Sequence, residues 1–264
     1  PATGFKLPII QNDSSSTKSF ISFNLHRQQS YGKEGYTLDV MGSGISLTAQ
    51  TLTGLFRATQ TLRQMLGSKI EASQKQEGPW KISQGHIVDY PRMDYRGFML
   101  DVSRHFYSVS EIKDILDQMA FYKFNVFHFH LTDDQGWRIE IPSWPKLTTI
   151  GSRSAVNQTD CESCFYTLEE FDDIIAYADQ RHITVIPEID TPGHIRAAMA
   201  SYPDELYCDG EAPDWPYTSM KVQISSLCFS NPKIYEFFND VIATIAPRIN
   251  GDYIHVGGDE TPKW

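Results

Sequence analysis

The chain has 264 residues, of which 41% are hydrophobic and 21% are charged. This composition is that of a globular protein, and it excludes a disordered, collagen-like or coiled-coil chain. With 23 basic and 33 acidic residues the formal net charge is −10, which argues against nucleic acid or an anionic membrane as the main partner. No run of about 18 apolar residues occurs, so we expect no membrane span. Since the chain begins at Pro1 without an apolar leader, we expect any targeting segment to have been removed.

Cysteines and glycosylation sequons both indicate an oxidising compartment. The simplest pairing predicts two disulfides, Cys161–Cys164 and Cys208–Cys228, because no second Cys-x-x-Cys or His-x-x-x-His motif completes a zinc set. Sequons begin at Asn12 and Asn157. We therefore expect a secreted, lysosome-like or periplasmic protein.

Residues 1–89 are expected to form a small α+β accessory domain. Strands are predicted over 20–24 and within 36–49, where apolar and polar residues alternate and a Gly-Ser-Gly turn intervenes. Leucines on one face predict a helix over 52–66, and the polar residues 71–79 predict a linker.

Residues 90–264 are predicted to form strands that alternate with helices. Short apolar runs predict strands over 98–100, 126–131, 183–186 and 253–256. Helix starts are indicated by the capping boxes Ser108/Glu111 and Thr167/Glu170 and by Pro232. This α/β order predicts parallel strands, in a barrel or in a doubly wound sheet.

Every predicted strand of this region is followed by acidic residues: Asp101, then Asp133 and Asp134, then Asp190 with His194, then Asp259 and Glu260. Parallel strands place their carboxyl ends at one edge, where barrel enzymes build their active sites. The pattern predicts one shared site.

The segment most indicative of catalysis is the pair Asp259–Glu260, which follows two glycines at a strand end. Adjacent carboxylates cannot readily flank a bond from opposite sides, but they can serve as one proton donor and one orienting anion. His194, four residues after Asp190, is expected to be held by that carboxylate and to tune the pKa of Glu260.

A metal site is the alternative chemistry. His128 and His130 share one face of a strand, and Asp133 or Asp190 could complete a metal-dependent hydrolase site. We favour packed strand histidines, because that metal arrangement usually begins at the first strand. We therefore expect no metal and no cofactor.

Four ordered segments resemble the family 20 glycoside hydrolases, the β-N-acetylhexosaminidases. They are RGFMLDVSRH at 96–105, HLTDDQGWR at 130–138, PEIDTPGH at 187–194 and HVGGDE at 255–260. The resemblance implies a (β/α)8 TIM barrel for residues 90–264 and a metal-free enzyme. Such an enzyme removes terminal β-linked GlcNAc or GalNAc from glycoconjugates or chitooligosaccharides with retention.

The resemblance also implies roles for the site residues. Glu260 would be the general acid/base, and Asp259 would hold the 2-acetamido group, whose carbonyl oxygen attacks the anomeric carbon to give an oxazolinium intermediate. Arg96 would bind the outer hydroxyls of the sugar. Asp133 and His194 would also belong to the substrate-binding residues and Asp190 would support them, with His194 bridging Asp190 to Glu260.

The predicted strands amount to four of the eight that a closed barrel needs. A further stretch of sequence or a second chain is therefore expected to complete the barrel, and a homodimer is the other expected assembly. A non-catalytic sugar-binding fragment is the alternative to an enzyme.

Overall fold

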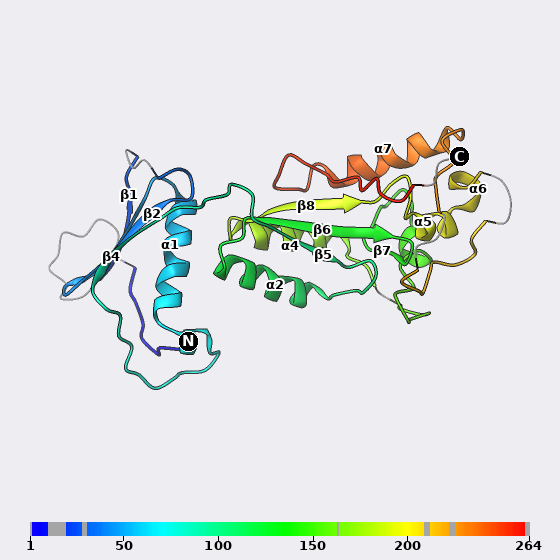
Figure 1. Cartoon of the computed structure of the whole chain (residues 1–264). Coiled ribbons are helices and arrows are strands. Elements are labelled where there is room, and N and C mark those ends of the chain that lie inside the picture. Colours follow the sequence, from blue (N-terminus) through cyan, green and yellow to red (C-terminus); the bar gives the residue numbers. More distant parts are fainter. Residues whose placement is uncertain are drawn as a thin grey trace. The chain divides into compact units, whose positions relative to one another are not determined.

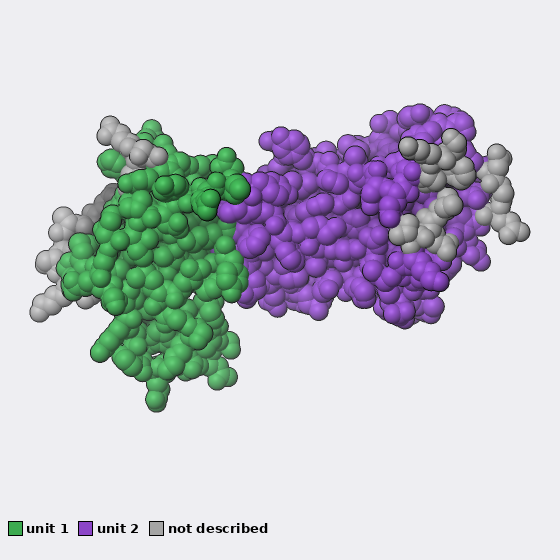
Figure 2. Space-filling model, in the orientation of Figure 1, with its two compact units in different colours: residues 1–94, 121–123 green, residues 95–120, 124–264 purple. Residues whose placement is uncertain are grey.

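The computed structural model describes residues 2–9, 20–27, 31–162, 164–208, 212–221 and 225–261. The chain divides into two compact units (Figure 2), one made of Pro1–Asp94 with Phe121–Lys123 and the other of Tyr95–Ala120 with Phe124–Trp264. The sequon at Asn12 lies outside the described residues, whereas Asn157 is exposed.

The first unit is a four-stranded sheet with one long helix. Its elements are β1 (Phe20–Leu25), β2 (Tyr36–Met41), β3 (Gly44–Ala49), α1 (Leu52–Met65), the 3-10 helix η1 (Ser68–Glu71) and β4 (Gly85–Asp89). The strand order is β1-β3-β2-β4, with β1 parallel to β3 and β2 antiparallel to both of its neighbours. The predicted strands and helix are confirmed, whereas β4 is an additional strand that the sequence did not predict.

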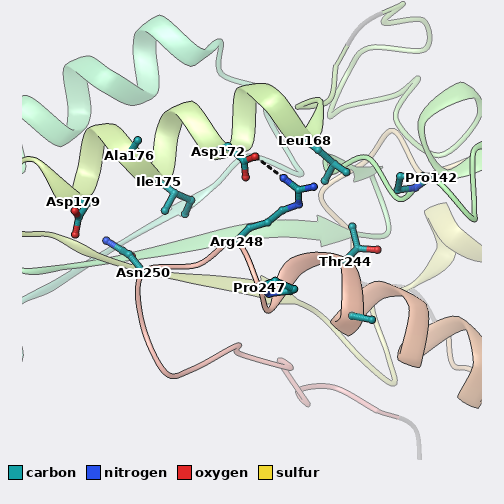
Figure 3. Close-up of a pocket in the computed structure, with 11 residues that line it drawn as sticks. Pro142, Leu168, Asp172, Ile175, Ala176, Asp179, Thr244, Pro247, Arg248 and Asn250 are labelled. Atoms are coloured by element: carbon teal, nitrogen blue, oxygen red, sulfur yellow. Dashed lines mark hydrogen bonds and ion pairs between the residues drawn. The ribbon is translucent and has the colours of Figure 1, made fainter.

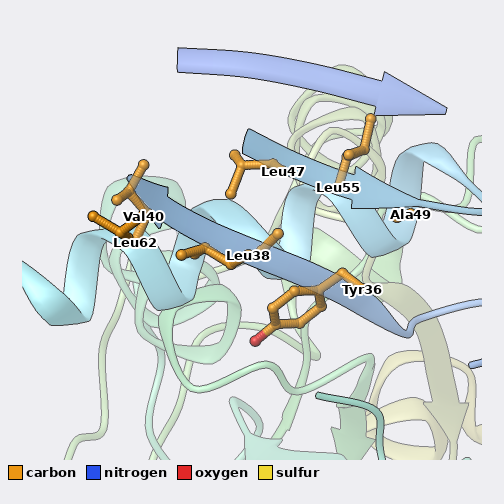
Figure 4. Close-up of a cluster of buried hydrophobic side chains, with 8 residues drawn as sticks. Tyr36, Leu38, Val40, Leu47, Ala49, Leu55 and Leu62 are labelled. Carbon is orange, nitrogen blue, oxygen red and sulfur yellow. The ribbon is translucent and has the colours of Figure 1, made fainter. Parts of the chain in front are cut away.

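One face of this sheet packs on α1. Tyr36, Leu38 and Val40 alternate along β2, so their side chains share one face and are buried together (Figure 4). They meet Leu55 and Leu62, which lie seven residues apart on α1 and so share one stripe of that helix. Thr51 caps the N-terminus of this helix, and its side chain accepts a hydrogen bond from the backbone N–H of Gly54 at 3.0 Å.

The second unit is built on parallel strands (Figure 1). Its strands are β5 (Gly97–Asp101), β6 (Val126–Asp133), β7 (Gly136–Trp137) and β8 (Thr184–Ile189). Strand β6 is central and runs parallel to both β5 and β8, while the two-residue β7 folds back on its end. The carboxyl ends of β5, β6 and β8 therefore lie at one edge, as the sequence predicts.

Helices connect these strands. They are α2 (Val109–Phe121), α3 (Lys146–Thr149), α4 (Leu168–Asp179), α5 (Arg196–Ser201), α6 (Pro203–Leu206) and α7 (Lys233–Ile245). Both predicted capping boxes are present, at the starts of α2 and α4. Phe171 of α4 stacks on Phe129 of β6 with ring centroids 6.5 Å apart, which packs this helix against the sheet. None of the described helices combines the length and the apolar character that a bilayer crossing requires.

The barrel prediction holds only in part. The strand predicted over 253–256 is reduced to a single parallel bridge between His255 and Glu188, and the described residues form no closed barrel. Phe98 and Met99, which point to opposite faces of β5, are 40% and 47% exposed. Both faces of this edge strand are therefore uncovered among the described residues.

Two disulfides and one buried arginine hold the loops at the carboxyl edge. The predicted pairs Cys161–Cys164 and Cys208–Cys228 are both present. Arg138 is fully buried, and its guanidinium donates to the backbone carbonyls of Val102, Ser103, Ser152, Ser154 and Cys164. These bonds tie the loop after β5 to the loop that carries the first disulfide.

Candidate active site

The residues that follow β6 and β8 meet the Asp259–Glu260 pair at the carboxyl edge of the sheet. His194 Nε2 lies 3.1 Å from Glu260 Oε2 and 3.7 Å from Asp259 Oδ2, and neither contact is aligned as a hydrogen bond. The Asp190 carboxylate accepts a hydrogen bond from the backbone N–H of Gly258 at 3.3 Å. The sequence prediction of one shared cluster is thus matched by the contacts between these segments.

The two glycines before the acidic pair allow the close approach of backbone and carboxylate. Gly257 and Gly258 have φ values of 64° and 100°, a region that disfavours residues with a side chain. A Cβ on Gly257 would lie 1.8 Å from Asp190 Oδ1. Glycine is therefore required at Gly257 both by its backbone conformation and by the space that Asp190 fills.

His194 is held by Asp133 and not by Asp190, which corrects the sequence prediction. Its Nδ1 lies 3.2 Å from Asp133 Oδ1, and its side chain is 3% exposed. Proximity in sequence favours Asp190, but the His194 ring, on a residue with left-handed backbone (φ 51°), meets Asp133 at the end of β6. The hydrogen bond to Asp133 raises the pKa of His194 to about 9 despite its burial.

Asp133 is the most enclosed carboxylate of the cluster. Its side chain has no exposed surface, and it contacts three cationic groups, those of Arg104, His130 and His194. Burial alone would raise the pKa of Asp133, but the hydrogen bonds from both histidines and the charge of Arg104 outweigh it, and the pKa is lowered. An anion enclosed in this way positions its neighbours and has no exposed surface for a sugar.

The pKa of Asp190 is shifted in the opposite direction from that of Asp133. Burial raises its pKa to about 7, and the nearby charge of Asp259 adds to that shift. Its backbone N–H donates to Thr132 Oγ1 at 3.0 Å, which fixes the start of the loop after β8. Near neutral pH the carboxyl group of Asp190 is therefore partly protonated.

The prediction for Arg96 is wrong in its position. Arg96 precedes β5, and its backbone pairs with the beginning of β6, whereas the acidic cluster lies at the other end of both strands. Five strand residues span roughly 16 Å. The arginine at the site is Arg104, which pairs with Asp101 and Asp133. The Asp-x-x-Arg spacing directly after β5 is the sequence signal that could have identified it.

The alternative metal set does not assemble. The ligand atoms of His128, His130 and Asp133 are not brought together as one group. His128 instead meets Glu188 and His255, and His130 meets Glu188 and Asp190, each set with its ligand atoms within 4.8 Å of one another. This cluster of histidines around Glu188 was not predicted from the sequence.

A cavity of about 760 Å³ lies elsewhere, between α4 and the end of α7 (Figure 3). Arg248 and Asp172 form an ion pair across it, and Asn250 and Asp179 line one end. None of its lining residues belongs to the acidic cluster, so we do not assign the chemistry to this cavity.

Comparison with known proteins agrees with this arrangement of motifs and fold. The model of the glycosyl hydrolase family 20 catalytic domain matches residues 93–264, and that of domain 2 of the same family matches residues 1–90. The chain belongs to glycosyl hydrolase family 20. The resemblance seen in the four sequence segments is therefore confirmed.

Relatives of this family 20 chain are hexosaminidases of greater length. A β-hexosaminidase of Porphyromonas gingivalis is 44% identical over 231 residues, which are 88% of this chain and 30% of that protein. The structure of Streptomyces plicatus N-acetyl-β-hexosaminidase with thio-NAglucal has a TM-score of 0.91 and 46% identity, covering 98% of this chain and 50% of that one. A mutant of the same enzyme was solved with its product GlcNAc. The family 20 chain thus spans half or less of these relatives.

Proposed function

We propose that this chain is the catalytic-centre part of a retaining exo-β-N-acetylhexosaminidase. Its substrates would be glycoconjugates or chitooligosaccharides that end in β-linked GlcNAc or GalNAc. Membership of family 20 supports the reaction class, and the GlcNAc product bound by the Streptomyces plicatus relative supports the sugar. We assign residues 1–89 to the accessory domain and 90–264 to the first half of the catalytic barrel.

One contact carries the assignment of the acid. The imidazole of His194 stands between the buried Asp133 and Glu260, at 3.2 Å and 3.1 Å. A cationic imidazole beside Glu260 stabilises the carboxylate that forms when this residue gives its proton to the leaving oxygen. Glu260 is then the general acid of the first step and the general base of the second.

Asp259 is assigned to the 2-acetamido group of the substrate. Two adjacent carboxylates do not fit the scheme in which a second carboxylate attacks the sugar, and family 20 is the known substrate-assisted exception to that scheme. The acetamido oxygen forms a bond to C1 while the glycosidic C1–O bond breaks and the leaving oxygen takes the proton of Glu260. Water then attacks C1, gives a proton to Glu260 and displaces the acetamido oxygen, which regenerates the starting configuration.

The remaining residues position this pair. Arg104 replaces Arg96 as the proposed cation of the sugar pocket, since it lies beside Asp101 and Asp133 at the carboxyl edge. His194 and Asp190 are proposed to set the position and charge of Glu260 and Asp259. The second half of the barrel, supplied by further sequence or by another chain, would wall the pocket. The two disulfides support an oxidising compartment for the protein.

Product stereochemistry and one substitution test the proposal. We expect proton NMR of the natural protein acting on an aryl N-acetyl-β-glucosaminide to show the β-anomer as the first product. Glu260→Gln should lower kcat by about 10²–10⁴-fold, the range for loss of a general acid. Glu236→Gln makes the same change on the exposed face of α7 and should leave kcat unchanged. An α-anomer as first product, or full activity of the Glu260 variant, would refute the assignment.

A further inference from the structure

The carboxylate of Glu188 is surrounded by three imidazoles behind the acidic cluster. Its side chain is 5% exposed, and it contacts Nε2 of His128, Nδ1 of His130 at 2.9 Å and Nδ1 of His255 at 3.2 Å. The contact with Nδ1 of His130 is an ion pair that is not aligned as a hydrogen bond. These groups come from β6, from β8 and from the segment before Gly257, so Glu188 joins neighbouring strands of the sheet.

His130 is shared between Glu188 and the buried carboxylate of Asp133. Its side chain is 4% exposed, and its second ring nitrogen, Nε2, lies 2.8 Å from Asp133 Oδ2. A continuous row of alternating acidic and basic groups therefore runs through the sheet from Glu188 to His130, Asp133, His194 and Glu260. We propose that Glu188 and His130 are positioning residues that act on Glu260 through Asp133 and His194.

The physical basis is the choice of proton position on His130. A neutral imidazole carries a proton on only one nitrogen, so His130 could hold it on Nδ1, the side of Glu188, and turn the lone pair of Nε2 toward Asp133. An anion on the Nδ1 side favours protons on both nitrogens, which keeps Nε2–H as a donor to Asp133. The same logic explains why a buried aspartate that orients a catalytic histidine matters so much for the serine-protease triad.

The charges around His130 agree with this assignment. Burial alone would lower its pKa, but the contacts with Asp133 and Glu188 outweigh burial and raise the pKa of His130 to about 10. The pKa of Glu188 is lowered by His128 and His130 against the effect of its burial. The other charged groups around His130 include Asp101, which favours its protonated form, and Arg104, whose Nη1 lies 3.2 Å from Nε2. The carboxylate of Asp190 also lies within 4.8 Å of a ring nitrogen of His130.

Arg104 makes the position of this proton consequential. If Nε2 of His130 lost its proton, it could accept a hydrogen bond from Arg104 in place of donating to Asp133. Asp133 would then lose the hydrogen bond from His130, and its contact with Arg104 would weaken. Because the His194 ring is held through its hydrogen bond to Asp133, that loss would loosen the imidazole that faces Glu260.

This inference rests on the proposed function, and kinetics on the natural protein tests it. The variants are Glu188→Gln, His130→Gln and the two combined, with Glu140→Gln as the matched control. Glu140 accepts a backbone hydrogen bond from Leu168 at 2.9 Å, so its replacement makes the same chemical change outside the row. We expect Glu188→Gln to lower kcat about tenfold with KM within about twofold of wild type, and Glu140→Gln to change neither. The double variant should be no slower than His130→Gln alone, because Glu188 acts through His130.

Wild-type kcat in Glu188→Gln, or multiplied losses in the double variant, would overturn the inference while leaving the proposed function intact. Absence of turnover by the wild type would contradict the proposed function instead. A second measurement does not depend on turnover or on how well a variant folds. Imidazole ¹⁵N–¹H spectra of the wild-type chain at pH 7 should show protons on both nitrogens of His130, and a single proton there would overturn the inference.

Discussion

The carboxylate of Asp190 occupies the space in which a side chain at Gly257 would stand. A Cβ there would lie 1.8 Å from Oδ1 and 3.1 Å from the backbone of Asp190. The segment that carries Asp259 and Glu260 therefore packs directly against the loop after β8. This packing holds Asp259 and Glu260 within reach of His194.

Gly257→Ala should consequently displace the acidic pair. We expect kcat to fall about a hundredfold, because a shift of about 1 Å at a reacting group has that effect. Gly67→Ala is the control: Gly67 has a φ of 75°, close to the 64° of Gly257, but no described atom lies within 4 Å of the point that its Cβ would occupy. The control should cost about 1–2 kcal/mol of stability and no activity. Equal kcat in both variants would mean that Asp190 does not seat this segment.

Stability should fall as the pH rises through the neutral and basic range. The folded pKa of His194 is raised from 6.5 to about 9, so its contribution is fully present below 6.5 and is lost as the pH rises through 9. The contribution of Asp190, whose pKa is raised from 3.8 to about 7, falls in the same direction and is lost by about pH 7. That of His130, whose pKa is raised from 6.5 to about 10, is lost over the range up to pH 10. Urea midpoints measured from pH 6 to pH 10 should therefore decrease. His194→Gln should flatten the decrease above pH 7, and an unchanged slope in that variant would contradict the assigned protonation.

Arg138 should be among the residues most important for the stability of the second unit. Arg138→Met removes donors from five backbone carbonyls in a buried setting, and we expect a loss of about 3 kcal/mol or more. Arg153→Met is the matched control, since this side chain is 38% exposed and pairs with Asp160 at the surface. The control should change the free energy of unfolding by about 0.5 kcal/mol at most. If Arg138→Met lost as little stability as the control, the buried carbonyls would have found other donors.

Local patterns predicted the parts of the fold that depend on neighbours in sequence. The alternation along β2 gave its buried face because side chains two residues apart share one side of a strand. Both capping boxes were predicted correctly because their hydrogen bonds close within three residues. The strand predicted over 253–256 is reduced to one bridge to Glu188 of β8, and among the described residues no strand pairs with its other side.

The sequence predicted the site residues that lie at the ends of strands. It missed the contacts that depend on tertiary structure. Parallel strands bring Asp133, Asp190 and Asp259 to one edge whatever the details of their loops. The partner of His194 depends instead on how its loop turns back, and Asp133 reaches it while Asp190 faces Gly258. The imidazoles around Glu188 meet only through the register between β6 and β8, which no spacing within either strand reveals.

The central claim is that the substrate's own acetamido group acts as the nucleophile. The most direct measurement compares hydrolysis by the natural protein of an aryl N-acetyl-β-glucosaminide with that of the matching plain β-glucoside. We predict turnover of the N-acetyl substrate alone, because the glucoside has no acetamido oxygen to attack C1. Comparable turnover of both substrates would contradict substrate assistance and the role proposed for Asp259.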